Sequence, residues 1–130
     1  MTDMMTHGSF GWNELATTDS NAARKFFGGL IGWTFKEVPM PGGGGSYIIA
    51  KAGEQRVGGM FKMGGERFKG LPSHWMGYIT VSYIDAAAKK VPNLGGTLMM
   101  PPTDIPNVGR FCILSDPSGA TLPSCNGPPR

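Results

Sequence analysis

Glu14 is the charged residue of this sequence with the strongest case for acid–base chemistry. It lies in the segment 10–17 (FGWNELAT), where the side chains alternate as they do in a β-strand. This alternation places Trp12 and Glu14 on one face of the strand. A carboxylate beside an indole is partly removed from water, which raises the pKa of the carboxyl group and suits it to act as a general acid or base. Glu14 could instead be structural and accept a hydrogen bond or an ion pair from Arg110 or another basic group.

Aromatic and methionine side chains extend the face that carries Glu14. If the alternation holds in the later strands, Phe61, Met76 and Tyr78 share a face with Trp12 and Glu14. Such side chains with a few polar groups are typical of a small-molecule pocket. They could equally fill the core. The sequence therefore predicts a substrate pocket of Trp12, Glu14, Phe61, Met76 and Tyr78, with Glu14 as the candidate base.

The histidines and cysteines do not suggest a second reactive centre. His7 is expected to be exposed in the N-terminal segment, and His74 is expected at the surface or at a strand edge, with the rim of a pocket as the alternative. Cys112 is expected to be an inert buried thiol, and Cys125 an exposed thiol in the C-terminal tail. Two cysteines without CxxC spacing do not make a disulfide framework, so we expect free thiols in a reducing compartment.

Composition excludes several classes of protein. The 130 residues are 40% hydrophobic and 16% charged, which suits one globular domain with a packed core. The net charge is +3 and the basic residues are scattered, whereas nucleic-acid-binding proteins concentrate them. No apolar run approaches the roughly 20 residues that span a bilayer, and no signal-peptide pattern is present. We therefore expect a cytoplasmic protein that binds neither nucleic acid nor membrane.

An internal repeat organises the elements that position these side chains. An offset of 64 places one half of the chain on the other and aligns Ala22, Ala23, Lys25, Leu30, Gly32, Gly45 and Ile49 with Ala86, Ala87, Lys89, Leu94, Gly96, Gly109 and Ile113. Each half contains a strand, a helix and three further strands. The expected strands are residues 10–17, 33–38, 46–52 and 55–63, and then 76–81, 97–100, 109–114 and 120–124. The pattern predicts an α+β protein of two βαβββ modules.

Turn and cap residues mark the ends of the helices. Asp19 or Ser20 is expected to cap the first helix, and the glycines 28, 29 and 32 are expected to end it. The second helix is expected over residues 85–90. The glycine run 42–45 lies between two strands of one module, so it predicts a long hairpin loop rather than a domain boundary.

An ordered set of short motifs connects the chain to a known family. The motifs are Trp12-Asn13-Glu14-Leu15, Asp19, Phe26-Phe27, Gly32-Trp33, Val57-Gly58-Gly59-Met60, Asp104-Ile105-Pro106, Gly109-Arg110 and Asp116-Pro117. The chain thereby resembles the vicinal oxygen chelate superfamily, which includes glyoxalase I, extradiol dioxygenases and bleomycin resistance proteins. The resemblance implies that the two modules form an incomplete mixed β-barrel with a site on its concave face. It covers a domain over residues 8–125, with modules at about 8–63 and 74–125 and flexible tails at 1–7 and 126–130.

The same resemblance identifies the positions at which many members hold a divalent metal. In this sequence those positions are Trp12, Gly59, Met76 and Pro123. None of the four side chains is an imidazole or a hard oxygen ligand, and the methionine sulfur suits Cu(I) at best. We therefore expect no metal and no other cofactor.

Three functions follow from these expectations. The first is a glyoxalase-like protein that binds a small, partly apolar organic molecule in the barrel cavity. The second is a metal-independent isomerase or lyase that uses Glu14 as its general base. The third is a metal-dependent glyoxalase-type or dioxygenase-type enzyme with unorthodox ligands. Family members of this size commonly form dimers, so we expect a homodimer.

Overall fold

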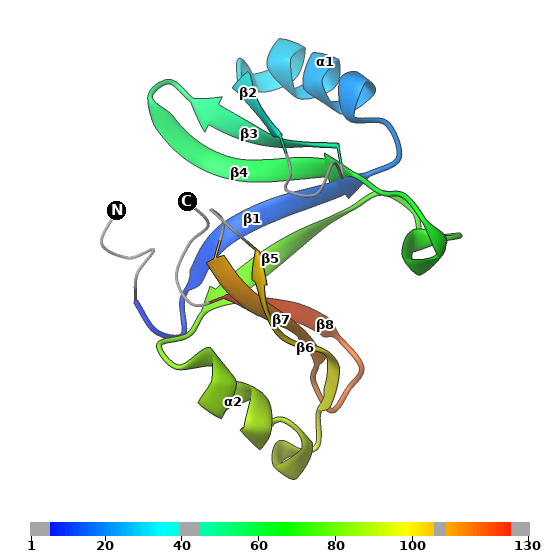
Figure 1. Ribbon diagram of the computed structural model, residues 1–130. Helices are drawn as coiled ribbons and strands as arrows, with labels where there is room; N and C mark the ends of the chain where they lie inside the picture. The colour runs from blue at the N-terminus through cyan, green and yellow to red at the C-terminus, as the bar shows by residue number, and fades with distance from the viewer. Residues whose placement is uncertain (1–5, 40–44, 106–108, 126–130) are drawn as a thin grey trace. The chain divides into compact units, whose positions relative to one another are not determined.

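The computed structural model describes residues 6–39, 45–105 and 109–125 (Figure 1). The first half contains β1 (Phe10–Thr17), α1 (Ser20–Ile31), β2 (Thr34–Pro39), β3 (Ser46–Ala52) and β4 (Gln55–Lys62). The second half contains β5 (His74–Thr80), α2 (Ile84–Lys90), β6 (Thr97–Ile105), β7 (Gly109–Ser115) and β8 (Thr121–Cys125), and short 3₁₀ turns lie at Glu66–Phe68 and Pro92–Leu94. The chain divides into two compact units, Asn13–Met76 and Met1–Trp12 with Gly77–Arg130. No helix among the described residues is long and apolar enough to cross a membrane.

The unit 13–76 is a four-stranded mixed sheet with one helix on one face. Its strands follow the order β2-β3-β4-β1, with β1 parallel to β4 and the other neighbours antiparallel. Leu15, Ile48 and Met60 form its buried core, against which Phe27 of α1 and Phe35 of β2 pack. Figure 1 shows α1 lying over this sheet. The face that carries Leu15 is therefore the helix side, as the alternation of β1 predicts.

Helix α1 begins and ends at residues whose chemistry fits the two positions. The Asp19 side chain accepts a hydrogen bond from the Ala22 N–H at 3.0 Å and caps the first turn. Gly32 adopts a left-handed conformation (φ 74°) and donates its N–H to the Gly28 carbonyl. The prediction that Asp19 or Ser20 caps the helix is confirmed for Asp19. The prediction that Gly28 and Gly29 help to end it is wrong, because the helix continues to Ile31.

The helical position of Gly29 makes it a site for stabilisation. Its φ is not positive, and an added Cβ would meet no atom within 4 Å. Gly29→Ala is expected to raise the free energy of unfolding by about 0.5–1 kcal/mol, because alanine loses less backbone entropy in a helix. Gly32→Ala is the matched control and is expected to lower it by about 1 kcal/mol, because its φ is left-handed. Urea denaturation measures both changes, and equal effects of the two substitutions would contradict the assignment of the cap.

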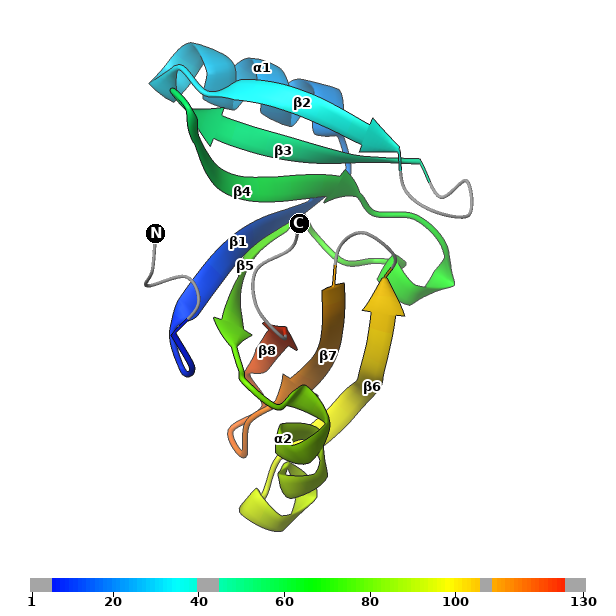
Figure 2. The same cartoon turned by 60° about the vertical axis from the view of Figure 1, so that its left-hand side comes forward.

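The second unit repeats this arrangement with its own helix. Its strands follow the order β5-β8-β7-β6, as Figure 2 shows, with β5 parallel to β8 and the other neighbours antiparallel. Ile84 and Ala88 of α2 pack against Cys112 of β7. The segment before Trp12 also belongs to this unit, since the Thr80 N–H donates to the Ser9 carbonyl at 2.8 Å.

Strand register confirms the internal repeat residue by residue. In the first module Leu15 is the partner of Met60, and in the second Ile79 is the partner of Ser124. Both residues of the second pair lie 64 positions after those of the first. The prediction of an α+β fold of two βαβββ modules is confirmed. In neither module does the strand order close on itself, because β2 and β6 are edge strands.

Several predicted boundaries differ from the observed ones. Strand β6 does not stop at Met100 but continues to Ile105 through Pro101 and Pro102. Proline is tolerated there because β6 is an edge strand, and the register with β7 shifts between Met100 and Thr103. The predicted glycine-rich loop lies mostly outside the described residues. Its flanks pair as Pro39 with Ser46, so β2 and β3 do form a hairpin.

Candidate functional site

The face of the first module opposite α1 carries a continuous row of residues across all four strands. Glu14 of β1 is the register partner of Gly59 of β4, Gly59 is the partner of Ile49 of β3, and Ile49 is the partner of Lys36 of β2. Residues paired in register point to the same side of a sheet. This row therefore places Glu14 and Lys36 on one face, with a glycine and an isoleucine between them.

A phenol reaches across this face to the carboxylate of Glu14. The hydroxyl of Tyr47 on β3 donates a hydrogen bond to Oε2 of Glu14 at 2.8 Å. Glu14 is only 8% exposed, and Tyr47 is half-buried. A hydrogen bond to a carboxylate that is largely removed from water is worth more than one at the surface. The pair is therefore a largely buried polar centre on this face.

Gly59 is the residue that lets the phenol reach Glu14. An added Cβ at Gly59 would overlap the hydroxyl oxygen and the Cζ atom of Tyr47 and would lie 2.6 Å from its Cε2 atom. Real Cβ atoms do not approach other atoms so closely. The Tyr47 ring can therefore lie over this position only because Gly59 has no side chain.

The structure divides the five predicted pocket residues between the two compact units. Trp12 and Tyr78 are buried together with Cys125 in an apolar cluster of one unit. Glu14 and Phe61 lie on the same face of the other unit's sheet, because Phe61 is the register partner of Ala16. The Phe61 ring packs edge-on against Phe68 with centroids 5.7 Å apart. Met76, also in that unit, is half-buried in β5. A pocket formed by all five remains a prediction.

Glu14 accepts a hydrogen bond from the phenol of Tyr47, whereas Arg110, the basic residue suggested as its partner, pairs with two aspartates. The guanidinium of Arg110 donates to both carboxylate oxygens of Asp85, at 2.7 and 3.1 Å, and forms an ion pair with Asp104 at 3.2 Å. Its hydrogen bonds hold the pKa of Asp85 below the usual range of a carboxyl group. Tyr47 could not be found from spacing, because it is 33 residues from Glu14 and its reach depends on the β3–β4 register.

Both histidines have backbone contacts. His7 is exposed, as predicted, and its Nδ1 accepts the N–H of Ser82 at 3.0 Å, at the start of the turn that leads to α2. His74 is half-buried at the first position of β5, and its Nδ1 lies 2.8 Å from the carbonyl oxygen of Pro72. These contacts give each imidazole a local structural role.

The prediction for Cys125 is wrong. It is 4% exposed, because β8 extends to this residue and pairs it with Phe111 of β7. Cys112 is 1% exposed, as expected for a buried thiol, and burial raises the pKa of that thiol. Both cysteines are free.

The buried cysteines should resist thiol reagents in the folded protein. Only the thiolate reacts rapidly, and burial disfavours it. In the native state we expect neither Cys112 nor Cys125 to react with Ellman's reagent at pH 8 within minutes. In guanidinium chloride both should react at once, giving two thiols per chain. Rapid modification of one native thiol would place Cys125 at the surface, as the sequence had suggested.

Comparison with known proteins decides the family. A model of the Glyoxalase/Bleomycin resistance protein/Dioxygenase superfamily matches residues 9–122. The chain belongs to this superfamily. It is 40% identical over 115 residues to "Putative glyoxylase CFP32" of Mycobacterium tuberculosis, covering 88% of this chain and 44% of that protein. It is 31% identical over 125 residues to "Anthracycline biosynthesis protein DauV" of a Streptomyces species, covering 88% and 46%.

Solved structures of the superfamily share the fold at low identity. Methylmalonyl-CoA epimerase from Mycobacterium tuberculosis superposes with a TM-score of 0.67 at 13% identity and covers 96% of this chain and 90% of that one. A mutant of 4-hydroxymandelate synthase from Streptomyces coelicolor gives 0.63 at 14% identity, covering 92% and 38%. The chain spans less than half the length of the curated relatives it matches.

The side chains at the four positions where the family resemblance leads us to expect metal ligands do not fit a divalent cation. In β4 the expected position is Gly59, and the phenol of Tyr47 occupies the space that a side chain at this position would need. In β8 it is Pro123, which is buried and has no ligand atom. Trp12 and Met76 complete the set. Within the described ranges no group of three or more His, Cys, Asp or Glu residues is placed to hold a metal.

Proposed function

We propose that this superfamily member binds a small, partly apolar organic molecule without a catalytic metal. The observation that carries the proposal is the Tyr47–Glu14 hydrogen bond over Gly59. It supplies a carboxylate and a phenol on a sheet face that also carries Ile49 and Phe61. A few polar groups among apolar and aromatic side chains are what small-molecule sites present. A hydroxyl group of the ligand would donate a hydrogen bond to the phenol oxygen of Tyr47 or to the carboxylate of Glu14.

Binding of 2-naphthol in the presence of EDTA tests this proposal. We expect it to raise the melting temperature and to bind with a measurable affinity in calorimetry. Tyr47→Phe should weaken the affinity by up to about tenfold, since the ligand loses its hydrogen bond to the phenol oxygen. Tyr83→Phe is the matched control, because Tyr83 is 78% exposed and should leave binding unchanged. Equal affinities of the two variants, or no binding without added metal, would overturn the proposal.

A metal-independent isomerase or lyase is the second candidate. Glu14 is a buried carboxylate with its orientation fixed by Tyr47, and a relative is named as a glyoxylase. In this function the Glu14 carboxylate would remove a proton from the hydroxyl-bearing carbon next to a carbonyl group and return it to the former carbonyl carbon, while the proton of that hydroxyl group moves to the former carbonyl oxygen. The hemithioacetal of methylglyoxal and glutathione is the test substrate. Glu14→Gln should abolish turnover in EDTA, and turnover that survives this substitution would remove the candidate.

The third candidate is a metal-dependent enzyme with unorthodox ligands. The same hemithioacetal assay distinguishes it from the second candidate. It requires activity that EDTA abolishes and a near-stoichiometric metal content in protein purified without a metal-affinity step. Activity in EDTA, with no metal in elemental analysis, would exclude it.

We further infer that the chain acts as a homodimer. Phe26, Leu30 and Ile31 of α1 are each more than half exposed, and apolar patches of this kind often mark protein–protein contacts. Sedimentation equilibrium should give twice the chain mass. Leu30→Glu should shift the mass towards that of the single chain if α1 takes part, and a single-chain mass for the parent protein would contradict the inference.

A further inference from the structure

We propose that Lys36, Lys51 and Arg56 form a binding subsite for an anionic group of the ligand. This inference rests on the proposed function and narrows the ligand class to a small organic anion. The three cations come from three neighbouring strands, β2, β3 and β4. They lie on the face that carries Glu14 and Tyr47.

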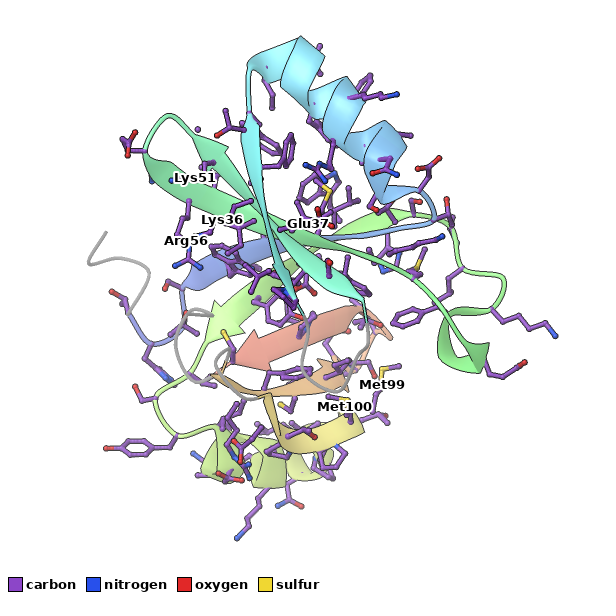
Figure 3. The ribbon with its side chains drawn as sticks, turned by 45° about the horizontal axis from the view of Figure 1, so that its top comes forward. Lys36, Glu37, Lys51, Arg56, Met99 and Met100 are labelled. Atoms are coloured by element: carbon purple, nitrogen blue, oxygen red, sulfur yellow. The ribbon has the colours of Figure 1, made fainter. Side chains whose placement is uncertain are left out.

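Strand register places the three side chains together. Lys36 is the partner of Ile49, and Lys51 lies two residues further along β3, so both point to the face opposite α1. A register shift between Ala50 and Lys51 brings Arg56 directly opposite Lys51. Figure 3 shows Lys36, Lys51 and Arg56 side by side, with Glu37 on the other side of β2. The grouping depends on this shift, which the sequence alone does not reveal.

The group presents its positive charge to a ligand. Lys36 is exposed and Lys51 is half-buried, and the register pair of Lys51 and Arg56 places two cationic side chains opposite each other on neighbouring strands. Neither Lys36 nor Lys51 forms an ion pair with any residue that the structure describes. Glu37 points to the helix side, where its Oε2 lies 3.5 Å from Nη1 of Arg24. Glu14 accepts a hydrogen bond from Tyr47. An anion bound at this place would give the two lysines an ion-pair partner.

The distance across the face defines the ligand further. Lys36 and Glu14 stand three strand spacings apart in one row, which is about 14 Å between their Cα atoms. Ile49 and Gly59 lie between them. The ligand class that fits has an anionic end at the three cations, an apolar body over Ile49, and a hydroxyl group at Tyr47. A phosphate and a carboxylate share the chemistry of the anionic end.

Matched naphthalene probes test the subsite by calorimetry at low and at high ionic strength. We expect 2-naphthyl phosphate to bind more tightly than 2-naphthol, and the difference to shrink with salt. The double variant Lys36→Gln/Lys51→Gln should lose about tenfold or more in affinity for 2-naphthyl phosphate and keep its affinity for 2-naphthol. Lys25→Gln/Lys62→Gln is the control, because it removes the same charge from exposed positions of the same unit. Equal losses in the two double variants would overturn the proposal, and so would tighter binding of an oligothymidylate.

Two further binding measurements identify the preferred anion and test the subsite independently of the proposed function on which it rests. Comparison of 2-naphthyl phosphate with 2-naphthoate shows whether phosphate or carboxylate is preferred. Inorganic pyrophosphate tests the cations without any contact to Tyr47. Binding that depends on Lys36 and Lys51 supports the subsite even if Tyr47→Phe leaves 2-naphthol binding unchanged, a result that would contradict only the proposed anchor. Failure of pyrophosphate and both anionic naphthalenes to bind would overturn the subsite.

Discussion

Gly59→Ala is expected to lower the free energy of unfolding by about 1–3 kcal/mol, the usual cost of inserting an extra carbon into a packed site. The new Cβ would overlap the hydroxyl and ring of Tyr47, and β4 is held between β3 and β1 on both sides. The strand therefore has little freedom to move. The Tyr47 ring must swing away instead, and the hydrogen bond to Glu14 is lost. Urea denaturation measures the change in stability.

Two variants separate this mechanism from a general intolerance of alanine in a strand. An added Cβ at Gly77 would also lie close to a ring, 2.8 Å from Cδ1 of Phe10, but Phe10 is 67% exposed and can rotate away. Gly77→Ala should therefore cost well under 1 kcal/mol, as ordinary surface changes do. Adding Tyr47→Ala to Gly59→Ala should relieve the overlap, so that the double variant is no less stable than Tyr47→Ala alone. Additive losses would contradict the account.

Local pattern was enough to predict the elements but not the contacts that cross strands. The alternation of β1 separates Leu15 from Glu14, and the structure keeps both on the faces expected. Asp19 caps α1 for the reason that its side chain suggests. The repeat offset extends to the register of paired strands. Each of these features depends on residues close in the chain or on a fixed spacing.

The features that sequence analysis missed depend on register or on edge position. The reach of Tyr47 to Glu14 requires that β3 place its phenol over a glycine of β4. The cluster of Lys51 and Arg56 arises from a register shift, because in regular pairing their side chains would not be opposed. Cys125 is buried because β8 pairs one residue further than its composition suggests. The sixth strand was predicted to end at Met100 because prolines follow it. Strand β6 continues to Ile105, since an edge strand tolerates proline.

Tyr47→Phe is the second substitution with a large expected effect. It removes the hydroxyl that donates to Glu14 and leaves a largely buried carboxylate with one donor fewer, at a cost of about 1–3 kcal/mol. The ring remains over Gly59, so packing is unchanged. Urea denaturation at pH 7 measures the loss. Tyr83→Phe serves as the control and should stay within about 0.5 kcal/mol of the parent protein, since Tyr83 is exposed.

A double-mutant cycle with Glu14→Gln isolates the charge in this interaction. Glutamine keeps a carbonyl oxygen that can accept the Tyr47 hydrogen bond, but a neutral amide is less costly than a carboxylate when it lacks a donor. Tyr47→Phe should therefore cost about 1 kcal/mol less in the Glu14→Gln background than in the parent protein. The same loss in both backgrounds would mean that Glu14 draws its stabilisation from other contacts. In that case the Tyr47–Glu14 pair would not be the polar centre on which ligand binding at this face is proposed to depend.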